Sequence, residues 1–363
     1  MKRNASSRIA PGELHLVVDR LCQRLQPYRR MVESALDPLF PVRTSLDRAV
    51  RHALFANAKR VRASLALIAC EAAGGTARDA LPIAVAFELL HTASLIHDDI
   101  MDGALVRRGR PCVHRAFGTS LAITAGDALI FEAYGVLQKS FGGDRQVAQV
   151  IEIFTSCAAK TCRGQALDLD YPNHPPSLHR YLRMIRAKTG SMMEAPVECA
   201  ALLAGAKPSW RGGFREYGRC LGIAFQITDD ATDYLGDEVS AGKSLGNDLL
   251  NGAGSPLLIF THHACSAGQR ETLATAIRRA RAAHATDSAA TLVATMQEHG
   301  AIEWTQRLCA RYADRARRAL QGIGTDPART ELAAIASIIG QWKIARPQLT
   351  KGASDEARRA VVH

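Results

Sequence analysis

Two groups of three aspartates have the residue types and the spacing to do chemistry. The first group, Asp98-Asp99-Ile100-Met101-Asp102, ends a run of helix-forming residues that contains no glycine. Residues three and four apart share one face of a helix, so the three carboxylates crowd a patch roughly 6 Å long. Like charges this close repel each other, and burying them without partners is costly. Hard divalent cations with oxygen ligands fit such a patch best.

The second group, Asp229-Asp230-Ala231-Thr232-Asp233, begins 131 residues later (229 − 98). A D-D-x-x-D pattern alone is a weak signal, and a solvated acidic helix face is the simpler interpretation. The apolar residues that precede both groups, and the repetition itself, argue against that interpretation. They favour two helices that face one another and hold several metal ions between them.

Two short basic motifs have the residue types to bind phosphates. Lys59-Arg60-Val61-Arg62 opens an apolar helix, where cations are unfavourable for the helix itself. They make sense if an anion binds there, because the amide dipoles and the cations then act together. The pair Arg107 and Arg108, directly after the first acidic group, suits bidentate phosphate contacts. For both motifs the alternative is ordinary surface charge.

Three further signals are weaker. His91 lies two helical turns before Asp98, but a lone histidine on a helix is more often a core residue than a ligand. Lys188 lies within an apolar helix, where an ordinary lysine extends its ammonium group to water. The loop that carries Gly242-Lys243 is rich in glycine and would be able to close over phosphates, although glycine loops alone are weak evidence.

Helices must position these residues, because helical spacing of apolar residues dominates the chain. Aromatic residues make up only 6% of the chain, and no alternating strand is followed by a hairpin signal. We expect an all-α, single-domain helical bundle over residues 13–345, between a flexible N-terminus (1–12) and a basic, mobile tail (346–363). The expected helices span residues 14–36, 46–55, 59–73, 81–101, 121–137, 146–167, 178–203, 214–234, 269–285, 288–299, 301–323 and 330–342.

The composition is that of a globular protein, with 47% hydrophobic and 22% charged residues. The net charge of +11 is compatible with an anionic substrate, an anionic membrane or a nucleic acid. The basic residues do not form one block with interleaved aromatic residues, so we expect no nucleic-acid partner.

Nine cysteines are scattered singly, with no C-x-x-C pair, which predicts buried free thiols in a reducing, cytoplasmic compartment. The N-terminus lacks an apolar segment, so no secretory signal is expected. No run of 18 consecutive apolar residues occurs, so we expect no membrane span.

Seven signals, in this order along the chain, resemble those of the trans-isoprenyl diphosphate synthases (polyprenyl synthetases). The resemblance covers roughly residues 53–256. It implies an all-α bundle around a deep central cavity, a homodimer, and Mg²⁺ as the cofactor with three ions in each active site. The seven signals are Lys59-Arg60-Val61-Arg62, His91, Asp98-Asp99-x-x-Asp102, Arg107-Arg108-Gly109-Arg110-Pro111, Lys188-Thr189-Gly190, Phe225-Gln226-Ile227-x-Asp229-Asp230-x-x-Asp233 and Gly242-Lys243-x-x-Gly246-x-Asp248-Leu249.

The resemblance implies a role for each matching residue. The metal ligands would be Asp98, Asp102 and Asp229, with Asp99, Asp230 and Asp233 as outer partners. These six aspartates and Lys188 would be the catalytic residues. The allylic diphosphate would be held by Arg107, Lys188, Thr189, Gln226 and Lys243. Isopentenyl diphosphate would be held by Lys59, Arg62, His91 and Arg108.

The implied reaction explains these residue types. Diphosphate leaves an allylic carbon, and metal ions and cationic side chains stabilise the charge that develops on it. The double bond of isopentenyl diphosphate attacks the resulting carbocation, and a proton is then lost. An apolar cavity protects the cation from water.

The sequence departs from the family pattern in two places. Asn57-Ala58 stands where the family commonly has two glycines before the basic motif. Ala253 stands where a lysine is common, in a Gly-Lys-x-Thr element after the glycine-rich loop. The second change removes one expected contact to the allylic diphosphate, but it leaves the reaction class unchanged.

Two other functions remain open. A class I terpene cyclase also uses a D-D-x-x-D helix, but it usually carries an Asn/Asp-Ser-Glu metal triad in place of the second acidic group. A non-catalytic subunit of a heteromeric synthase typically lacks one acidic group, and here both are present.

Product length is expected to depend on the helical turns that precede Asp98. Ala93 and Ser94 are small, whereas bulky aromatic residues at these positions stop the chain at the farnesyl stage in the family. Leu90 and Phe87, one and two turns further back, are large enough to form a floor. We therefore expect geranylgeranyl diphosphate as the main product, with farnesyl or longer polyprenyl diphosphates as alternatives. Small residues are also ordinary in helix packing.

Overall fold

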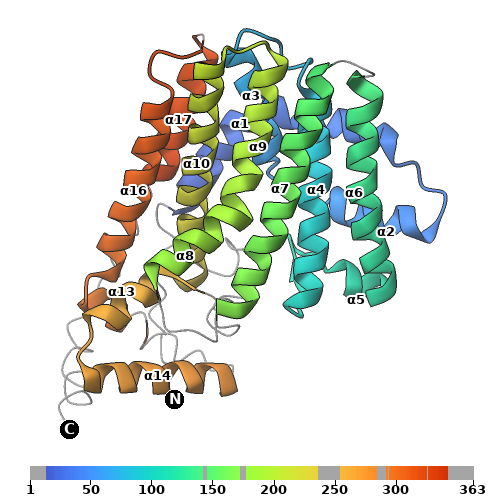
Figure 1. Cartoon of the computed structure of the whole chain (residues 1–363). Helices are drawn as coiled ribbons and strands as arrows, with labels where there is room; N and C mark the ends of the chain where they lie inside the picture. The colour runs from blue at the N-terminus through green and yellow to red at the C-terminus, as the bar shows by residue number, and fades with distance from the viewer. Residues whose placement is uncertain are drawn as a thin grey trace, which may run out of the picture.

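The described part of the chain is a bundle of α-helices with one small hairpin, so the predicted all-α class is confirmed (Figure 1). The structure is a computed structural model that describes residues 14–141, 145–171, 177–235, 254–283, 292, 294–324 and 326–341. The two predicted terminal segments and the loop around Lys243 lie outside these residues.

Most of the predicted helices are present at close to their expected bounds. The helices and the two strands are α1 (Leu14–Leu36), η1 (Asp37–Leu39), α2 (Ser45–Leu54), α3 (Val61–Ala72), α4 (Leu81–Met101), β1 (Val106–Arg107), β2 (Arg110–Pro111), α5 (Val113–Phe117), α6 (Thr119–Phe141), α7 (Arg145–Asp170), α8 (Leu178–Ile185), η3 (Arg186–Gly190), α9 (Ser191–Leu203), α10 (Pro208–Leu235), α13 (Pro256–Ala264), α14 (Ala267–Ala283), α16 (Ala301–Ala319) and α17 (Ala328–Gly340).

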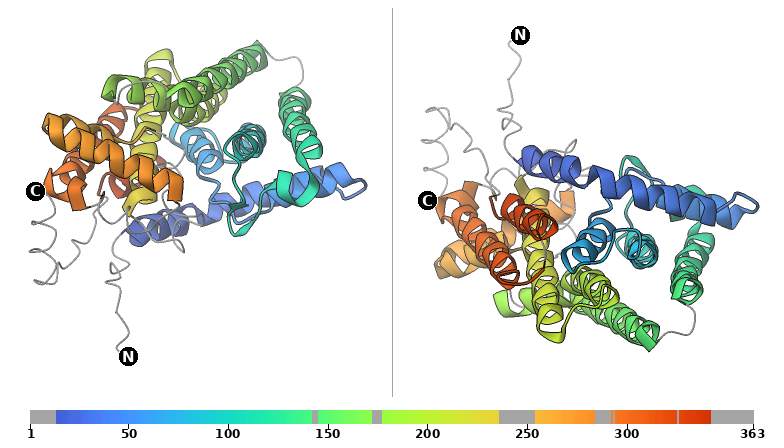
Figure 2. Two further views of the ribbon diagram at one scale, coloured as in Figure 1. Left: turned by 90° about the horizontal axis from the view of Figure 1, so that it is seen from below. Right: turned by 90° about the horizontal axis from the view of Figure 1, so that it is seen from above.

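The core is organised around α3 and α4, which Figure 2 shows nearly end-on in the middle of the molecule. Almost every residue of α3 is buried, and α4 is buried along most of its length. Their sequences are apolar on all sides, as expected for helices enclosed by other helices. The C-terminal end of α4, which carries the first acidic group, is therefore fixed by packing on several sides.

One predicted helix, 178–203, is interrupted. It forms α8, then the π-helical turn η3 (Arg186–Gly190), and then α9. Helical periodicity in the sequence does not distinguish a π turn from an α turn, because the insertion shifts the register by only one residue. Such turns occur frequently at functional sites, and this one contains Lys188 and Thr189.

The basic segment after α4 forms an antiparallel hairpin, whereas we expected no hairpin. Val106 pairs with Pro111, and Arg107 pairs with Arg110. The two residues of the turn, Arg108 and Gly109, both have positive φ values, 53° and 76°. Left-handed conformations at both turn positions match the right-handed twist of hairpin strands. Strands of two residues are too short to produce an alternating sequence pattern, so the hairpin was missed.

Helix α6 contains a stretch, Thr119–Ser140, that is long and apolar enough to cross a membrane by length and composition alone. The sequence contains no unbroken run of 18 apolar residues, and this stretch meets the test by its mean hydropathy. One third of the stretch is buried in the bundle, and Asp127 and Glu132 interrupt its apolar surface.

The N-terminus of α3 depends on a buried ion pair. Arg60 has the left-handed φ of 52° directly before α3, and its side chain is fully buried. Its guanidinium group lies 2.7 Å from the carboxylate of Glu88 on α4 and also donates a hydrogen bond to the carbonyl group of Leu54. This pair joins α3 to α4 and leaves the neighbouring basic residues, Lys59 and Arg62, available for other contacts.

We predict that Glu88→Gln lowers the free energy of unfolding by about 3–5 kcal/mol, because it leaves the buried charge of Arg60 without its partner. The exposed pair Arg24–Glu331, at 2.7 Å, provides a matched control. Arg24→Ala should cost no more than about 1 kcal/mol. Denaturant unfolding at a fixed protein concentration measures both values, and equal losses would contradict the assignment.

Candidate active site

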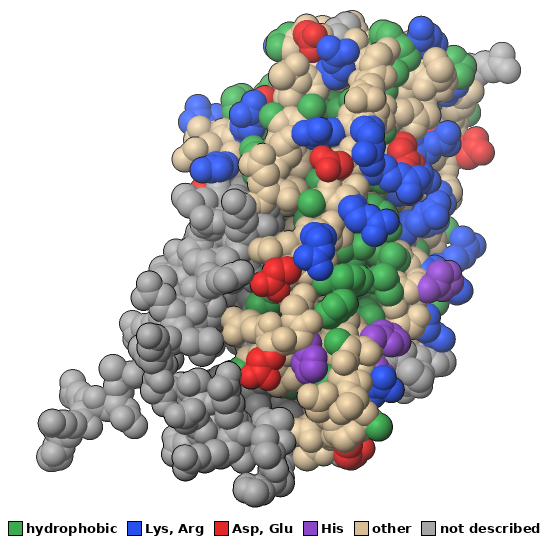
Figure 3. Space-filling model, turned by 90° about the vertical axis from the view of Figure 1, so that its left-hand side faces the viewer, with side chains coloured by type: hydrophobic (Ala, Val, Ile, Leu, Met, Phe, Trp, Pro, Cys, Tyr) green, Lys and Arg blue, Asp and Glu red, His purple; other side chains and the backbone are tan. Residues whose placement is uncertain are grey.

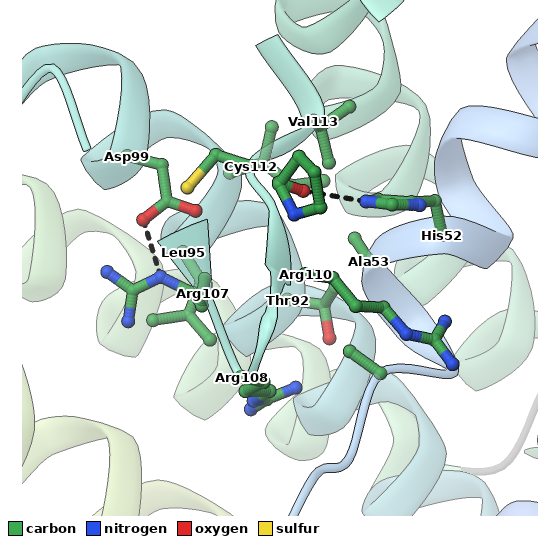
Figure 4. A pocket seen from close by; sticks show the side chains of 13 residues that line it. His52, Ala53, Thr92, Leu95, Asp99, Arg107, Arg108, Arg110, Cys112 and Val113 are labelled. Carbon is green, nitrogen blue, oxygen red and sulfur yellow. Dashed lines mark hydrogen bonds and ion pairs between the residues drawn. The ribbon is translucent and has the colours of Figure 1, made fainter. Parts of the chain in front are cut away.

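The first acidic group divides between two faces of α4. Asp98 and Asp102 are close to Lys188, and burial raises the pKa of both carboxyl groups in spite of that positive charge. Asp99 is almost fully buried and lies 2.5 Å from Arg107 of the hairpin (Figure 4). This ion pair holds the hairpin against α4.

Lys188 of η3 contacts carboxylates on both α7 and α4. Its ammonium nitrogen lies 2.7 Å from Asp168 Oδ2 and 3.8 Å from Asp98 Oδ2. Burial works against the charge of Lys188, but the carboxylates of Asp168 and Asp98 outweigh burial and raise its pKa. A fully charged lysine therefore lies at the acidic end of α4.

A chain of hydrogen bonds links η3 to the second acidic group on α10. Thr189 donates to Gln226 Oε1 at 2.6 Å, and Gln226 donates to Asp230 Oδ1 at 2.7 Å. Tyr181 of α8 donates to the other oxygen of Asp230 at 2.5 Å. Asp230 is therefore held within the bundle.

Of the other two aspartates on α10, Asp233 is buried whereas Asp229 is exposed. Asp229 is close enough to Arg62 for its charge to favour the protonated guanidinium group. Asp229 is therefore accessible at the surface of α10, whereas Asp230 and Asp233 are enclosed by the bundle.

The basic residues expected to bind isopentenyl diphosphate gather beside α4. Arg62 donates a hydrogen bond of 3.1 Å to His91 Nε2. Burial and the charge of Arg62 lower the pKa of His91, so its ring is neutral and accepts this bond. Burial, together with the charges of Arg60, Arg107 and Arg62, lowers the pKa of Arg108 to about 10. Such a concentration of buried positive charge favours an anionic ligand. Lys59 lies exposed just before α3, the helix that carries Arg62.

Behind the hairpin lies a pocket between α2, α4 and α5, with Arg107 and Arg108 on its wall (Figure 4). His52 of α2 donates a hydrogen bond of 2.7 Å from Nε2 to the carbonyl oxygen of Pro111. Together with the Asp99–Arg107 pair, this bond ties both strands of the hairpin to the bundle. His52 therefore helps to fix Arg108, a role that its position in the sequence does not indicate.

The residues expected to set product length differ in their surroundings. Phe87 is fully buried, and its ring packs edge-on against Phe154 of α7 at 5.1 Å between centroids. Phe154 packs in turn against Tyr134 of α6 at 5.0 Å. Ser94 is half-buried and donates its hydroxyl group to the carbonyl group of His91.

Helix geometry separates the four length candidates. Ser94 precedes Asp98 by four residues and lies roughly 40° from it around the helix axis, on nearly the same face, whereas Ala93 lies roughly 140° from Asp98. Both Ala93 and Leu90 are buried. Three aromatic rings from α4, α6 and α7 thus meet near the end of α4 that is remote from the acidic group.

The carboxylates on α4 and α10 are suitable ligands for Mg²⁺ ions that are also coordinated by a substrate. Within the described ranges, no three His, Cys, Asp or Glu side chains converge closely enough to hold a metal ion by themselves. Mg²⁺ is commonly held by one or two carboxylates together with substrate phosphates and water. Asp98 and Asp102, whose charge is only partly balanced by Lys188, and the exposed Asp229 match that donor set.

Sequence analysis missed two residues that the structure brings to the site. Asp168 lies just after the expected helix 146–167 and carried no signal there, although its carboxylate is nearer to Lys188 than that of Asp98. Tyr181 carried no signal, because an apolar tyrosine on a helix is typical of a core residue.

Positive charge also extends over an outer face of the molecule, where Lys and Arg side chains are spread among carboxylates (Figure 3). Among the ion pairs of α10, Glu216 pairs with Arg219 and with Arg315 of α16, so both arginines are partly neutralised.

Comparison with known proteins agrees with this geometry. The family model of polyprenyl synthetase matches residues 43–296. A short chain isoprenyl diphosphate synthase from Methanothermobacter thermautotrophicus is 34% identical over 296 residues, which cover 81% of this chain and 90% of that protein. The octaprenyl diphosphate synthase of Escherichia coli is 33% identical over 285 residues, which cover 78% of this chain and 85% of that protein.

Solved structures show the same fold. Geranylgeranyl pyrophosphate synthetase from Pyrococcus horikoshii superimposes with a TM-score of 0.82 and 28% identity, covering 90% of this chain and 99% of that one. Geranylgeranyl pyrophosphate synthase from Corynebacterium glutamicum, solved with isoprenyl diphosphate and magnesium, gives a TM-score of 0.77 and 25% identity over 92% and 100% of the two chains. Both acidic groups and all of the basic motifs lie within the region that the family model matches. The chain therefore belongs to the polyprenyl synthetase family of trans-prenyl diphosphate synthases, and it is a prenyltransferase.

Proposed function

We propose that this protein condenses isopentenyl diphosphate with allylic diphosphates in a Mg²⁺-dependent reaction, and that geranylgeranyl diphosphate is its main product. The observation that supports this most directly is the placement of Lys188 between Asp98 and Asp168, with the Arg62–His91 pair further along α4. The position beside Lys188 and Asp98 suits the allylic diphosphate, which leaves together with metal ions. The position beside Arg62 and His91 suits the diphosphate of isopentenyl diphosphate, which stays bound to its carbon chain throughout the reaction.

The allylic diphosphate binds at the acidic end of α4. Arg107, Lys188, Thr189 and Gln226 supply donors there, and we assign Lys243 to the same role. When bound to Asp98, Asp102 and Asp229, Mg²⁺ ions stabilise the negative charge that develops on the leaving group. Lys188 contributes to the same stabilisation, because its raised pKa keeps the ammonium group charged.

Isopentenyl diphosphate binds to Arg62, Arg108, Lys59 and His91. Seven residues separate His91 from Asp98, which corresponds to roughly 10 Å along the axis of α4. This spacing keeps the two diphosphates apart while the reacting carbons approach each other between them. The allylic C–O bond breaks and releases diphosphate, the new C–C bond forms, and one proton passes from the isopentenyl unit to the departed diphosphate.

The depth of the aromatic floor supports a geranylgeranyl product. Phe87 precedes Asp98 by 11 residues, or roughly 16 Å along α4. Three single bonds of an extended chain span 3.8 Å, so the four chain bonds of one isoprene unit span about 5 Å. Roughly three units therefore fit between the metal ligands and the Phe87–Phe154 contact. A farnesyl chain has three units, and its extension by one unit gives geranylgeranyl diphosphate.

We also propose that the protein is a homodimer that pairs through α6. Phe131 and Ile123, eight residues apart, lie on the same face of this helix and are 74% and 45% exposed. Only one third of the long apolar stretch in α6 is buried within the chain. An apolar helix face that is left uncovered favours burial against a second copy of the same face.

The metal-site assignment predicts that Asp98→Asn and Asp229→Asn each lower turnover at least ~10²-fold, the effect of losing an electrostatic stabiliser. The assay is incubation of the purified protein with Mg²⁺, isopentenyl diphosphate and a series of allylic diphosphates. Asp314→Asn, on the exposed face of α16, is the control and should retain full turnover. Near-normal turnover of either site variant would refute the assignment. Hydrocarbon products would indicate a cyclase instead, and no turnover by the unaltered protein would indicate a non-catalytic subunit.

The floor assignment predicts opposite changes in product length from two variants. Ser94→Phe places a ring below Asp98 and should shift the product toward farnesyl diphosphate. Phe87→Ala removes the floor and should yield products longer than geranylgeranyl diphosphate. Chromatography of the products measures both outcomes. If both variants are active and their product lengths do not change, these side chains do not line the path of the growing chain.

The proposed dimer predicts that Phe131→Asp converts the protein to a monomer, because two buried carboxylates would face each other across the interface. Analytical ultracentrifugation measures the change. Leu39→Asp, at an exposed apolar residue outside α6, should leave the dimer intact. A monomeric unaltered protein would contradict the proposal.

A further inference from the structure

The π turn η3 is clamped between two helices that approach it through glycine. A Cβ atom on Gly164 of α7 would lie 2.3 Å from the backbone nitrogen of Lys188 and 2.7 Å from its Cα atom. On the other side, a Cβ atom on Gly222 of α10 would lie 2.9 Å from the Cα atom of Gly190 and 3.2 Å from the carbonyl oxygen of Thr189. Backbone atoms cannot yield as flexible side chains do, so any larger residue at either position would displace the turn.

This clamp fixes where the side chain of Lys188 begins. Hydroxyl groups add to it, because Ser191 donates to the carbonyl group of Ala187 at 2.5 Å and lies 3.2 Å from Thr161 of α7. The clamp does not determine the position of the ammonium group at the end of the side chain. A lysine side chain has four rotatable bonds, so a fixed backbone alone does not place the ammonium group.

Asp168 supplies the missing constraint. It lies one helical turn beyond Gly164 on α7, and its carboxylate holds the ammonium group at 2.7 Å. The same ammonium group then lies 3.8 Å from Asp98, on the opposite helix. Asp168 thus holds the ammonium group of Lys188 beside Asp98, at the acidic end of α4.

We infer that Asp168 is a positioning residue for Lys188, acting on the allylic diphosphate through that lysine, with Gly164 and Gly222 fixing the backbone beneath it. This inference rests on the proposed function, because it assumes that Lys188 binds the allylic diphosphate. A purely structural salt bridge would also join α7 to η3. The two roles differ in which substrate they affect and in whether the effect needs Lys188.

The decisive test is a double-mutant cycle with Asp168→Asn and Lys188→Gln. Asp168→Asn should raise the KM of the allylic diphosphate about tenfold, the effect of losing one charge-assisted hydrogen bond. It should leave the KM of isopentenyl diphosphate within about twofold. In the Lys188→Gln background, Asp168→Asn should have little further effect, because the two residues act as one unit.

A binding measurement accompanies the kinetics. Calorimetric titration with geranyl S-thiolodiphosphate, an unreactive analogue of an allylic substrate, should show the same loss of affinity in Asp168→Asn and the same absence of a further loss in the double variant. Asp170→Asn, two residues further along α7 and exposed, is the matched control and should bind the analogue as the unaltered protein does. Arg108→Gln should show the reverse pattern, with the larger change in the KM of isopentenyl diphosphate.

Three outcomes would overturn the inference. The first is an equal change in both KM values, and the second is a full additional effect of Asp168→Asn in the Lys188→Gln background. The third is that the lower affinity arises only because part of the variant protein is unfolded.

Gly164→Ala is an independent test and should raise the KM of the allylic diphosphate. The melting temperature of this variant is measured in parallel. If the unaltered protein neither turns over nor binds the analogue, the proposed function fails. If it does both and Asp168→Asn behaves like Asp170→Asn, only the positioning role fails.

Discussion

Carboxylates that are withdrawn from water need positive charge close by, and at the C-terminal end of α4 that charge comes from two sides. Lys188 approaches Asp98 from η3, and Arg107 of the hairpin pairs with Asp99. The two cations lie on different faces of α4, so the helix cannot rotate or shift without breaking one of the contacts. The positions of α7, η3 and the hairpin therefore all depend on the charge balance of this one helix end.

Close approach of backbones makes that balance possible. Gly164 and Gly222 let α7 and α10 reach the π turn, and Gly218 lets α10 approach the carbonyl group of Met193 on α9 in the same way. These contacts bring polar groups from different helices within hydrogen-bond distance, as in the series from Thr189 through Gln226. The site is thus built from side chains on rigid elements, which favours a fixed geometry for the bound diphosphate.

Local patterns in the sequence accounted for most of the fold. The spacing of apolar residues located α1, α3, α4 and most later helices, because a buried helix face must be apolar at each turn. The pattern of apolar residues did not predict the hairpin or the π turn, and the reasons are physical. Two-residue strands produce no alternation, and a π turn adds one residue without changing the hydrophobic character of the segment.

The sequence by itself determined the chemical classes of the site, because two aspartate triplets on apolar helices require cations, and the basic motifs favour anionic ligands. Only the tertiary structure decided which aspartate faces which partner. Asp98 faces Lys188, Asp99 faces the hairpin, and Asp168 joins the site from a helix on which it carried no signal. The reason is that Lys188 is 20 positions from Asp168 and 90 from Asp98 (188 − 98), and that a non-periodic turn brings Arg107 back to Asp99, so no local periodicity encodes these contacts.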